Sequence, residues 1–354
     1  MATPWMERLA QAQAAPTWLT ARNPSQVTFS KGAIIRTILA DLSPDQLSTG
    51  ATMIHEHLTG SYSSPPAARG AQAAPGQRAD AQDVGLMVEE MRASRFDGVH
   101  CIVDSALQRR SAENVDQMRQ IASRSGMHIV LGGGYYLAPY PPEVPKMSED
   151  QLADQFYQDA AAQRWGALGE IGTSLETHPD ERKVMRAVAK AHVRTGLPIF
   201  THSPHESCPK CSLEQLDLYQ SNGVNVANLC IGHLSAIKFE DDPRGDTLKA
   251  VAKRGAFIGF DTVGHQMTRS HIPEVQKVKM FMMMLEAGYE NNLLLSGDFA
   301  QENNIKANWG NGWSSVVLQF VPKLRFAGVK DETLHKILVD NPRRFLAFVP
   351  KQKA

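Results

Sequence analysis

Short apolar, β-rich runs recur along the chain, and each of them ends in polar or small residues. They lie at 51–57, 98–105, 128–136, 167–174, 197–203, 228–235, 256–263 and 293–300. Between most of them lies a stretch with the apolar spacing of a helix and a glycine near its end, as in 180–196. Eight strands that alternate with helices predict an α/β fold of the (β/α)8 barrel type, the TIM barrel.

The spacing of the polar residues that end the later runs supports this architecture. Glu170, His202, His233, Asp261 and Asp298 follow one another at intervals of 28 to 37 residues, each about one βα unit. A doubly wound open sheet is the structural alternative. Against it, the first run is not followed by a glycine-rich phosphate turn, and glycines 132–134 lack the GxGxxG spacing. We expect these glycines in a tight loop beside the barrel mouth.

The chain divides into two predicted parts. Residues 1–50 precede the first barrel strand and form an N-terminal extension, in which 33–43 is expected to make a strand or hairpin that caps the barrel bottom. Residues 51–349 form the barrel domain. Residues 61–80 are rich in Ala, Pro, Gly and Ser, which predicts a loop at the catalytic rim, either a lid or an inert insertion.

Composition and charge limit the kinds of molecule that the chain is expected to bind. The 354 residues include 37 basic and 37 acidic side chains, so the formal net charge is zero. The chain therefore has no basic field to drive binding to nucleic acid or to a membrane surface. It also has neither a membrane-spanning apolar run nor a signal-peptide pattern. We expect a cytoplasmic protein with a small-molecule substrate.

The four cysteines are too few for a disulfide framework in a chain of this length, and they fit a reducing compartment. The segment 208–211, CPKC, has the spacing of a zinc knuckle or a redox pair, but no second Cys or His pair follows at a matching distance. We place it in a loop after the fifth strand rather than at a helix start. The expectation is an incidental reduced pair, with a redox protein as the alternative.

The first predicted strand ends in the sequence His55-Glu56-His57. Because side chains alternate along a strand, the two histidines point the same way, and in a barrel that direction can be inward. Their place at the carboxyl end of the strand is where barrel active sites lie. Glu56 then points outward and is expected to be a structural hydrogen-bond or ion-pair partner. Alone, the pair does not distinguish a metal site from a polar strand.

Other strand ends add the partners that a metal site needs. Burying so many titratable groups on one rim would be costly without compensation. Four imidazoles and two carboxylates suit zinc, which we favour, or manganese, iron or cobalt. Two such ions about 3.5–4 Å apart need a bridging carboxylate, and a bridging water would have a pKa near 7. The predicted ligands are His55, His57, Glu170, His202, His233 and Asp298.

The order of these residues resembles the phosphotriesterase family of the amidohydrolase superfamily. The resemblance runs from the first strand through NPRRFL at 341–346. It implies that His55, His57 and Asp298 hold one divalent ion. It also implies that Asp298 is the general base, which orients the nucleophile and passes its proton to the leaving group.

The resemblance further implies that His202 and His233 hold a second ion and that Glu170 bridges the two. Many family members carry a carboxylated lysine at the bridging position. The carboxylated lysine and the glutamate that this chain has at 170 both present two oxygens and one negative charge, so either can bridge two ions. A subgroup of the family has glutamate there, including phosphotriesterase homologues and enzymes that cleave N-acyl amino compounds.

A second departure concerns the proton relay of efficient phosphotriesterases. The matching positions look like Thr262 and Ala236, which cannot carry a proton in that way. We therefore expect a hydrolase for a lactone, a carboxylic ester or an amide, with phosphoric triester or diester hydrolysis as the alternative. A barrel that has lost catalysis and only binds ligands is a third option, but no predicted ligand or base is missing. Many barrels of this family are dimers, and the sequence leaves monomer or homodimer open.

Candidate substrate-binding residues lie in the loops after the predicted strands: Tyr135, Tyr136, Asp261, His265, Arg269, Trp309 and Trp313. The tyrosines could polarise a substrate oxygen or pack in the wall, and Asp261 could accept from a water or a substrate hydroxyl. His265 and Arg269 could bind an anionic tail or be exposed without a role. The tryptophans could form an apolar wall. His205 could also touch substrate.

Overall fold

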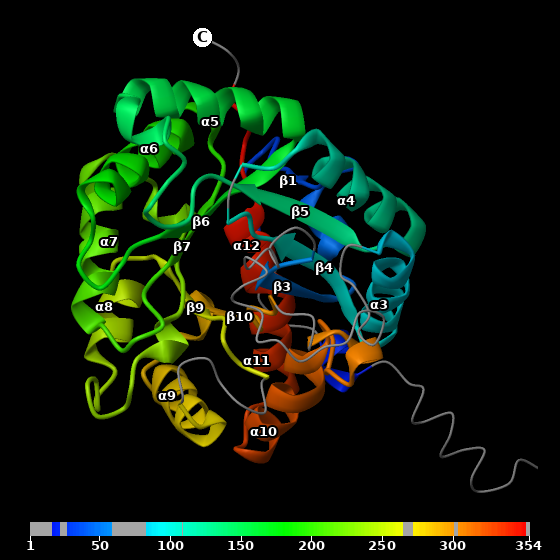
Figure 1. Cartoon of the computed structure of the whole chain (residues 1–354). Helices are drawn as coiled ribbons and strands as arrows, with labels where there is room; N and C mark the ends of the chain where they lie inside the picture. The colour runs from blue at the N-terminus through cyan, green and yellow to red at the C-terminus, as the bar shows by residue number, and fades with distance from the viewer. Residues whose placement is uncertain are drawn as a thin grey trace, which may run out of the picture.

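The computed structural model describes residues 16–21, 27–58, 83–107, 109–264, 272–300 and 304–351. Eight parallel strands pair in chain order. Figure 1 shows them at the centre of a ring of helices. The predicted (β/α)8 barrel is confirmed. Its strands are β3 (Ala51–Glu56), β4 (Val99–Asp104), β5 (His128–Gly133), β6 (Trp165–Gly172), β7 (Ile199–His202), β8 (Leu229–Ile231), β9 (Phe257–Phe260) and β10 (Leu293–Leu295).

The barrel closes through the residues that follow β10. The Asp298 amide donates to the His55 carbonyl at 3.1 Å, and the His57 amide donates to the Phe299 carbonyl at 3.0 Å. The His55 amide donates to Ser296 Oγ at 2.9 Å. The strand that carries the two histidines is therefore fastened directly to the segment that carries Asp298.

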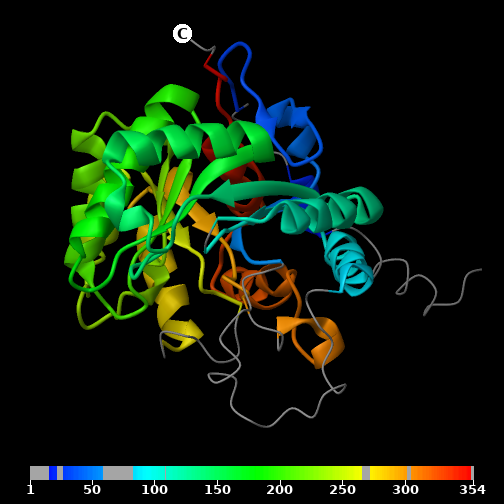
Figure 2. The same cartoon turned by 45° about the horizontal axis from the view of Figure 1, so that its top comes forward.

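Helices cover the outside of the barrel, as the tilted view in Figure 2 shows. Their ends carry recognisable signals: the Ser111 side chain accepts from the Asn114 amide at the start of α4, and Gly196 ends α6 at a φ of 79°. No helix among the described residues is long and apolar enough to cross a membrane. The helices are α2 (Thr17–Thr20), α3 (Val84–Phe96), α4 (Ala112–Ser125), α5 (Glu149–Gln163), α6 (Pro179–Thr195), α7 (Pro209–Ser221), α8 (Asp246–Lys253), α9 (Glu274–Glu286), α10 (Val321–Phe326), α11 (Asp331–His335) and α12 (Asn341–Leu346).

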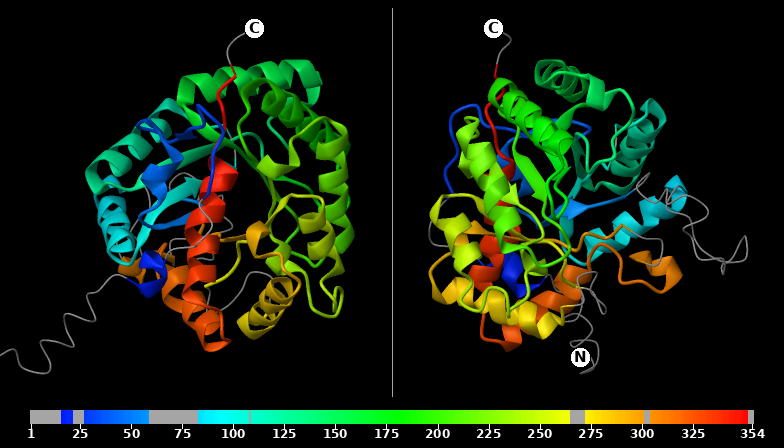
Figure 3. Two further views of the ribbon diagram at one scale, coloured as in Figure 1. Left: turned by 180° about the vertical axis from the view of Figure 1, so that it is seen from behind. Right: turned by 60° about the vertical axis from the view of Figure 1, so that its left-hand side comes forward.

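The N-terminal segment contributes a cap to the barrel bottom. The predicted hairpin is present as β1 (Ile35–Arg36) and β2 (Asp41–Leu42), which pair antiparallel. Its apolar side chains share one buried cluster with α12 and with inward-facing residues of the strands. Seen from behind in Figure 3, α12 lies across the centre of the molecule. The division into 1–50 and 51–349 stays a prediction, and the 61–80 loop lies outside the described residues.

The glycines at 132–134 do not form the tight loop that the sequence indicated. Gly132 and Gly133 are the last residues of β5. A Cβ at Gly132 would lie 2.3 Å from the Gly169 carbonyl oxygen, and one at Gly133 would lie 2.1 Å from the Trp165 ring. The missing side chains thus allow β5 to pack closely against β6.

The CPKC segment also differs from the prediction. Cys208 and Cys211 form a disulfide with their Cα atoms 5.4 Å apart. Cys208 is the residue that precedes α7, so the pair does sit at a helix start. The first helical turn brings residues three apart onto one face, which places the two sulfurs within bonding reach. Among the described residues, Cys101 and Cys230 are free and buried, and the reducing compartment stays a prediction.

Candidate metal centre

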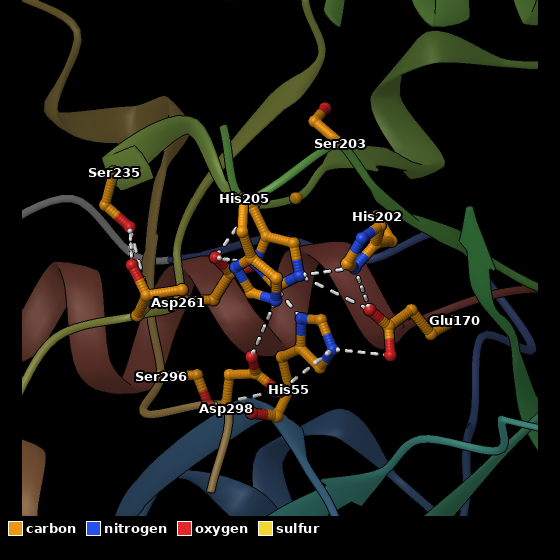
Figure 4. Close-up of polar contacts among 12 residues, drawn as sticks. His55, Glu170, His202, Ser203, His205, Ser235, Asp261, Ser296 and Asp298 are labelled. Carbon is orange, nitrogen blue, oxygen red and sulfur yellow. Dashed lines mark hydrogen bonds and ion pairs between the residues drawn. The ribbon is translucent and has the colours of Figure 1, made fainter. Parts of the chain in front are cut away.

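The six predicted metal ligands meet at the carboxyl end of the barrel. Each is at most 3% exposed, although together they come from five different strands or the segments that directly follow them. Figure 4 shows His55, Glu170, His202 and Asp298 around one point. The sequence separation of these residues is large, so it is the closed barrel that brings them together.

One side of the centre consists of His55, His57 and Asp298. One potential ligand atom from each lies within 4.8 Å of the other two. His57 Nε2 is 3.1 Å from Asp298 Oδ1, and His57 Nδ1 is 3.2 Å from the Ser105 carbonyl oxygen. If Nδ1 carries the proton and donates it to that carbonyl, Nε2 is left with its lone pair toward the centre.

Glu170 lies between this side and the opposite one. Its Oε2 is 3.2 Å from His55 Nε2. Its Oε1 is 2.6 Å from His202 Nδ1 and 3.3 Å from His233 Nε2. One carboxylate oxygen thus faces each side, which is the arrangement that a bridging ligand requires.

The residues present fit a metal ion. Within the described part of the chain, His55 Nε2 and Glu170 Oε2 are buried and make no hydrogen bond. A buried polar atom that makes no hydrogen bond lowers the stability of the folded protein unless another group, such as a bound ion, contacts it. His202 Nδ1 and His233 Nε2 lie only 2.7 Å apart, so two ring nitrogens converge on the same place. Imidazole and carboxylate donors in this number suit first-row divalent ions.

The electrostatics of the centre favour positive charge. Burial alone would lower the pKa of His55, but the carboxylates of Glu170 and Asp261 raise it well above its usual value. For His233, burial is likewise outweighed by Asp261 and Glu170, and the pKa rises to about 9. In Glu170 the opposite occurs: burial would raise the pKa, but His55 and His202 hold it well below its usual range. A buried cluster of three carboxylates attracts cations in this way.

Asp261 has a different place from the one predicted for it. It is fully buried, with Oδ2 3.0 Å from His55 Nδ1 and Oδ1 3.0 Å from His233 Nδ1. The His233 amide also donates to Oδ1 at 2.8 Å. Both oxygens are therefore turned to the histidines rather than to a substrate, and Asp261 orients one histidine on each side of the centre.

Glu56 holds the segment that carries Asp298, in the structural role that the sequence indicated. Its two carboxylate oxygens accept from the amides of Gly297 and Phe299 at 2.7 and 2.8 Å. Burial raises its pKa to about 8 despite these bonds. Asp298 itself has a φ of 50°, a backbone conformation that side-chain-bearing residues rarely adopt. We attribute the retention of that conformation to the Glu56 contacts.

The predicted substrate-binding residues separate in the structure. Tyr136 remains at the centre, with its hydroxyl 3.0 Å from His202 Nε2. Tyr135 instead packs in the core, where its hydroxyl accepts from Gln155. Trp313 is fully buried and Trp309 is 97% exposed, so the two do not form the expected common wall. His265 and Arg269 lie outside the described residues.

One feature of the site was not visible in the sequence. Lys277 of α9 is fully buried, and its ammonium group donates to the carbonyl and the hydroxyl of Thr262. Burial lowers its pKa to about 8. Thr262 also lies 2.8 Å from Ser235 through the two hydroxyls, so hydrogen bonds hold this neighbourhood together. The apolar spacing of α9 gave no signal that one lysine would turn inward.

His205, for which the sequence indicated a substrate contact, lies next to the predicted metal ligands. Its Nε2 lies 3.8 Å from Asp298 Oδ2. Its ring stacks on that of His233 with the centroids 4.4 Å apart. Its position in the chain, three residues after His202, was the only available signal.

Comparison with known proteins places this site in a family. The model of the phosphotriesterase family matches residues 34–346. N-acetyltaurine hydrolase from Salmo salar is 30% identical, with 89% of this chain and 98% of that protein covered. Two crystal structures are also similar. The phosphotriesterase homology protein from Escherichia coli, complexed with phosphate in its active site, has a TM-score of 0.70 at 28% identity and covers 84% of this chain and 99% of that one. A lactonase from Listeria monocytogenes has a TM-score of 0.73 at 25% identity and covers 89% and 99%.

The fold and the site thus define a barrel hydrolase whose polar side chains converge at the carboxyl ends of the strands. The chain belongs to the phosphotriesterase family. The resemblance noted in the sequence is confirmed at the level of the family, whereas its assignment to the glutamate-containing subgroup stays a prediction.

Proposed function

We propose that this protein is a hydrolase that uses two divalent metal ions to cleave the amide bond of small N-acyl amino compounds. The observation that carries the proposal is the meeting of four histidines and two carboxylates in one buried cluster, with Glu170 between its two sides. The relative from Salmo salar, whose name states that it hydrolyses N-acetyltaurine, supports an amide as the substrate.

Each side chain has a distinct task in this proposal. His55, His57 and Asp298 would hold one ion, His202 and His233 the other, and Glu170 would bridge them. Bound there, the ions would lower the pKa of a water toward ~7 and polarise the scissile carbonyl. Zinc is the ion we favour, with manganese, iron or cobalt as alternatives.

Side chains of the protein carry out the proton transfers and orient the substrate. Asp298 accepts a proton from the attacking water at its carboxylate and delivers it to the leaving nitrogen. Tyr136, whose hydroxyl lies 3.0 Å from His202 Nε2, is in a position to donate a hydrogen bond to the substrate carbonyl oxygen. Glu56 and Asp261 do not touch the substrate, but they fix Asp298 and the two histidines.

Lactone or carboxylic ester hydrolysis is the second candidate, because the similar structure from Listeria monocytogenes is a lactonase. Both reactions pass through attack on a carbonyl carbon, so the same residues would serve. Phosphoric ester hydrolysis is disfavoured, because Thr262 and Ala236 occupy the positions of the relay.

The test combines metal analysis with a substrate panel. Purified protein should contain two divalent ions per chain and should hydrolyse N-acetyltaurine or a related N-acyl amino compound faster than lactones or aryl phosphotriesters. His55→Ala and Glu170→Ala should each lose metal and activity. Metal and activity retained in both variants would refute the proposal, and a faster lactone reaction would favour the second candidate.

A further inference from the structure

His205 presents a third imidazole to the side of the centre that His202 and His233 form. We propose that His205 is a further protein ligand of the metal centre and completes a three-histidine face with these two residues. The inference rests on the proposed function, because it needs a metal-loaded centre. The ligand set that the family resemblance implies does not contain this residue.

The geometry of the three rings supports a common ion. One potential ligand atom from each of His202, His205 and His233 lies within 4.8 Å of the other two. The ring centroids are 4.4 Å apart for His202 and His233, 4.4 Å for His205 and His233, and 5.0 Å for His202 and His205. Three nearly equal separations mean that the rings surround one place instead of forming a row.

The separations also suit the dimensions of a metal site. Zinc–imidazole bonds of about 2.0–2.1 Å put two cis ligand nitrogens roughly 3.0–3.4 Å apart. Ligand atoms at most 4.8 Å apart would have to approach one another by less than about 2 Å to reach that spacing. His205 already faces the centre, since its Nε2 is 3.8 Å from Asp298 Oδ2, and Figure 4 shows its ring among the other site residues.

The segment that carries His205 is fastened at both ends. Next to His202, the Ser203 hydroxyl lies 3.2 Å from the Ser212 hydroxyl. At the other end, Ser207 Oγ accepts from the Lys238 amide at 2.9 Å, and Cys208 is bound to Cys211. These contacts tie the segment to α7 and to the neighbouring loop. They hold His205 over the centre, with its side chain only 24% exposed.

A histidine that merely touched substrate would have different properties. It would affect the Michaelis constant or the turnover of one substrate, but it would leave the metal affinity of the substrate-free protein unchanged. Metal binding measured without substrate therefore separates the two roles.

The experiment compares wild type with His205→Ala, and with His205→Asn as a second variant of similar polarity. His178→Ala is the control, because His178 caps α6 with its side chain 54% exposed. Dissociation constants for Zn²⁺ and Co²⁺ are measured on metal-free protein by competition with a chelator. Visible absorption spectra of the Co²⁺-loaded forms report the coordination number of the ion.

We expect both His205 variants to bind one ion with wild-type affinity and the other at least tenfold more weakly, with altered cobalt absorption bands. The unaffected ion shows that the variants are folded, and His178→Ala should match wild type throughout. Two ions bound with wild-type affinity and an unchanged cobalt spectrum in both variants would overturn the inference while leaving the proposed function intact. A wild-type protein that binds no ions would instead overturn the proposed function.

Discussion

Asp261 Oδ2 lies 3.0 Å from Nδ1 of His55, and the other oxygen of the same carboxylate lies 3.0 Å from Nδ1 of His233. One buried side chain thus orients a histidine on each side of the centre. Burial would raise the pKa of Asp261, but His233 and His55 hold it well below its usual range, so the group stays ionised. An ionised Asp261 accepts the Nδ1 protons and leaves both Nε2 atoms available as ligands.

Asp261→Asn should therefore weaken the binding of both metal ions at once. The amide cannot accept from two imidazoles, so we expect the dissociation constants of both ions to rise about 10- to 100-fold. Chelator competition measures this directly. Asp217→Asn, which alters an exposed partner of Arg254, is the matched control and should behave as wild type. If only one ion were weakened, Asp261 would not be acting on both sides.

Lys277→Met should change the pH dependence of stability. Burial lowers the pKa of Lys277 to about 8 in the folded protein, against 10.5 as the ordinary value. Between these two values the unfolded chain binds more protons than the folded one, so the stability of wild type rises with pH in that window. The methionine variant lacks this contribution.

Chemical denaturation at several pH values from 7 to 10.5 measures the free energy of unfolding of both proteins. Wild type should gain about 3 kcal/mol relative to Lys277→Met as the pH rises from 8 toward 10.5. Parallel curves for the two proteins would show that the folded pKa of Lys277 is not lowered.

The Cys208→Ser/Cys211→Ser variant should be less stable than wild type. A disulfide that closes so short a loop is expected to contribute about 2 kcal/mol to the free energy of unfolding. Urea denaturation measures the difference, and dithiothreitol should bring wild type to the level of the variant. A wild-type curve that coincides with that of the variant without reductant would show that the pair is reduced in the purified protein.

Gly132→Ala should destabilise the barrel through a steric conflict with backbone. The new Cβ would lie 2.3 Å from the Gly169 carbonyl oxygen, so β5 or β6 has to move. Overpacking of this kind costs about 1–3 kcal/mol, to be measured by thermal or urea denaturation. As control, Gly85→Ala in the first turn of α3 meets only the Asp83 side chain at 3.1 Å and should be neutral or mildly stabilising. Equal stability of the two variants would contradict the close packing of β5 on β6.

The barrel and its candidate ligands could be predicted from the sequence because the patterns that indicate them are local. Side-chain alternation along a strand makes His55 and His57 point the same way, whatever the rest of the chain does. The polar residue after each later strand follows the period of a βα unit. In a barrel all such strand ends share one rim, so the topology alone brings Glu170, His202 and Asp298 together.

The residues around the site could not be predicted from the sequence, because their contacts depend on which loops and helices pack together. Nothing local distinguishes Trp309, which is 97% exposed, from Trp313, which is fully buried. The disulfide between Cys208 and Cys211 depends on a helix that starts immediately after Cys208. Asp261 could be assigned its histidine partners only after the positions of His55 on β3 and of His233, which follows β8, were known.

The barrel and the identity of the candidate ligands followed from the amino-acid sequence, since short segments carry the strand period and the residue types. The three-dimensional packing was needed to show that the two oxygens of Glu170 face opposite sides of the cluster. It was also needed to show that Asp261 contacts a histidine on each side and that His205 lies beside His202 and His233. Those relationships join residues that are up to about 240 positions apart, as His55 and Asp298 are, and only the packing of separate strands fixes the distance between such residues.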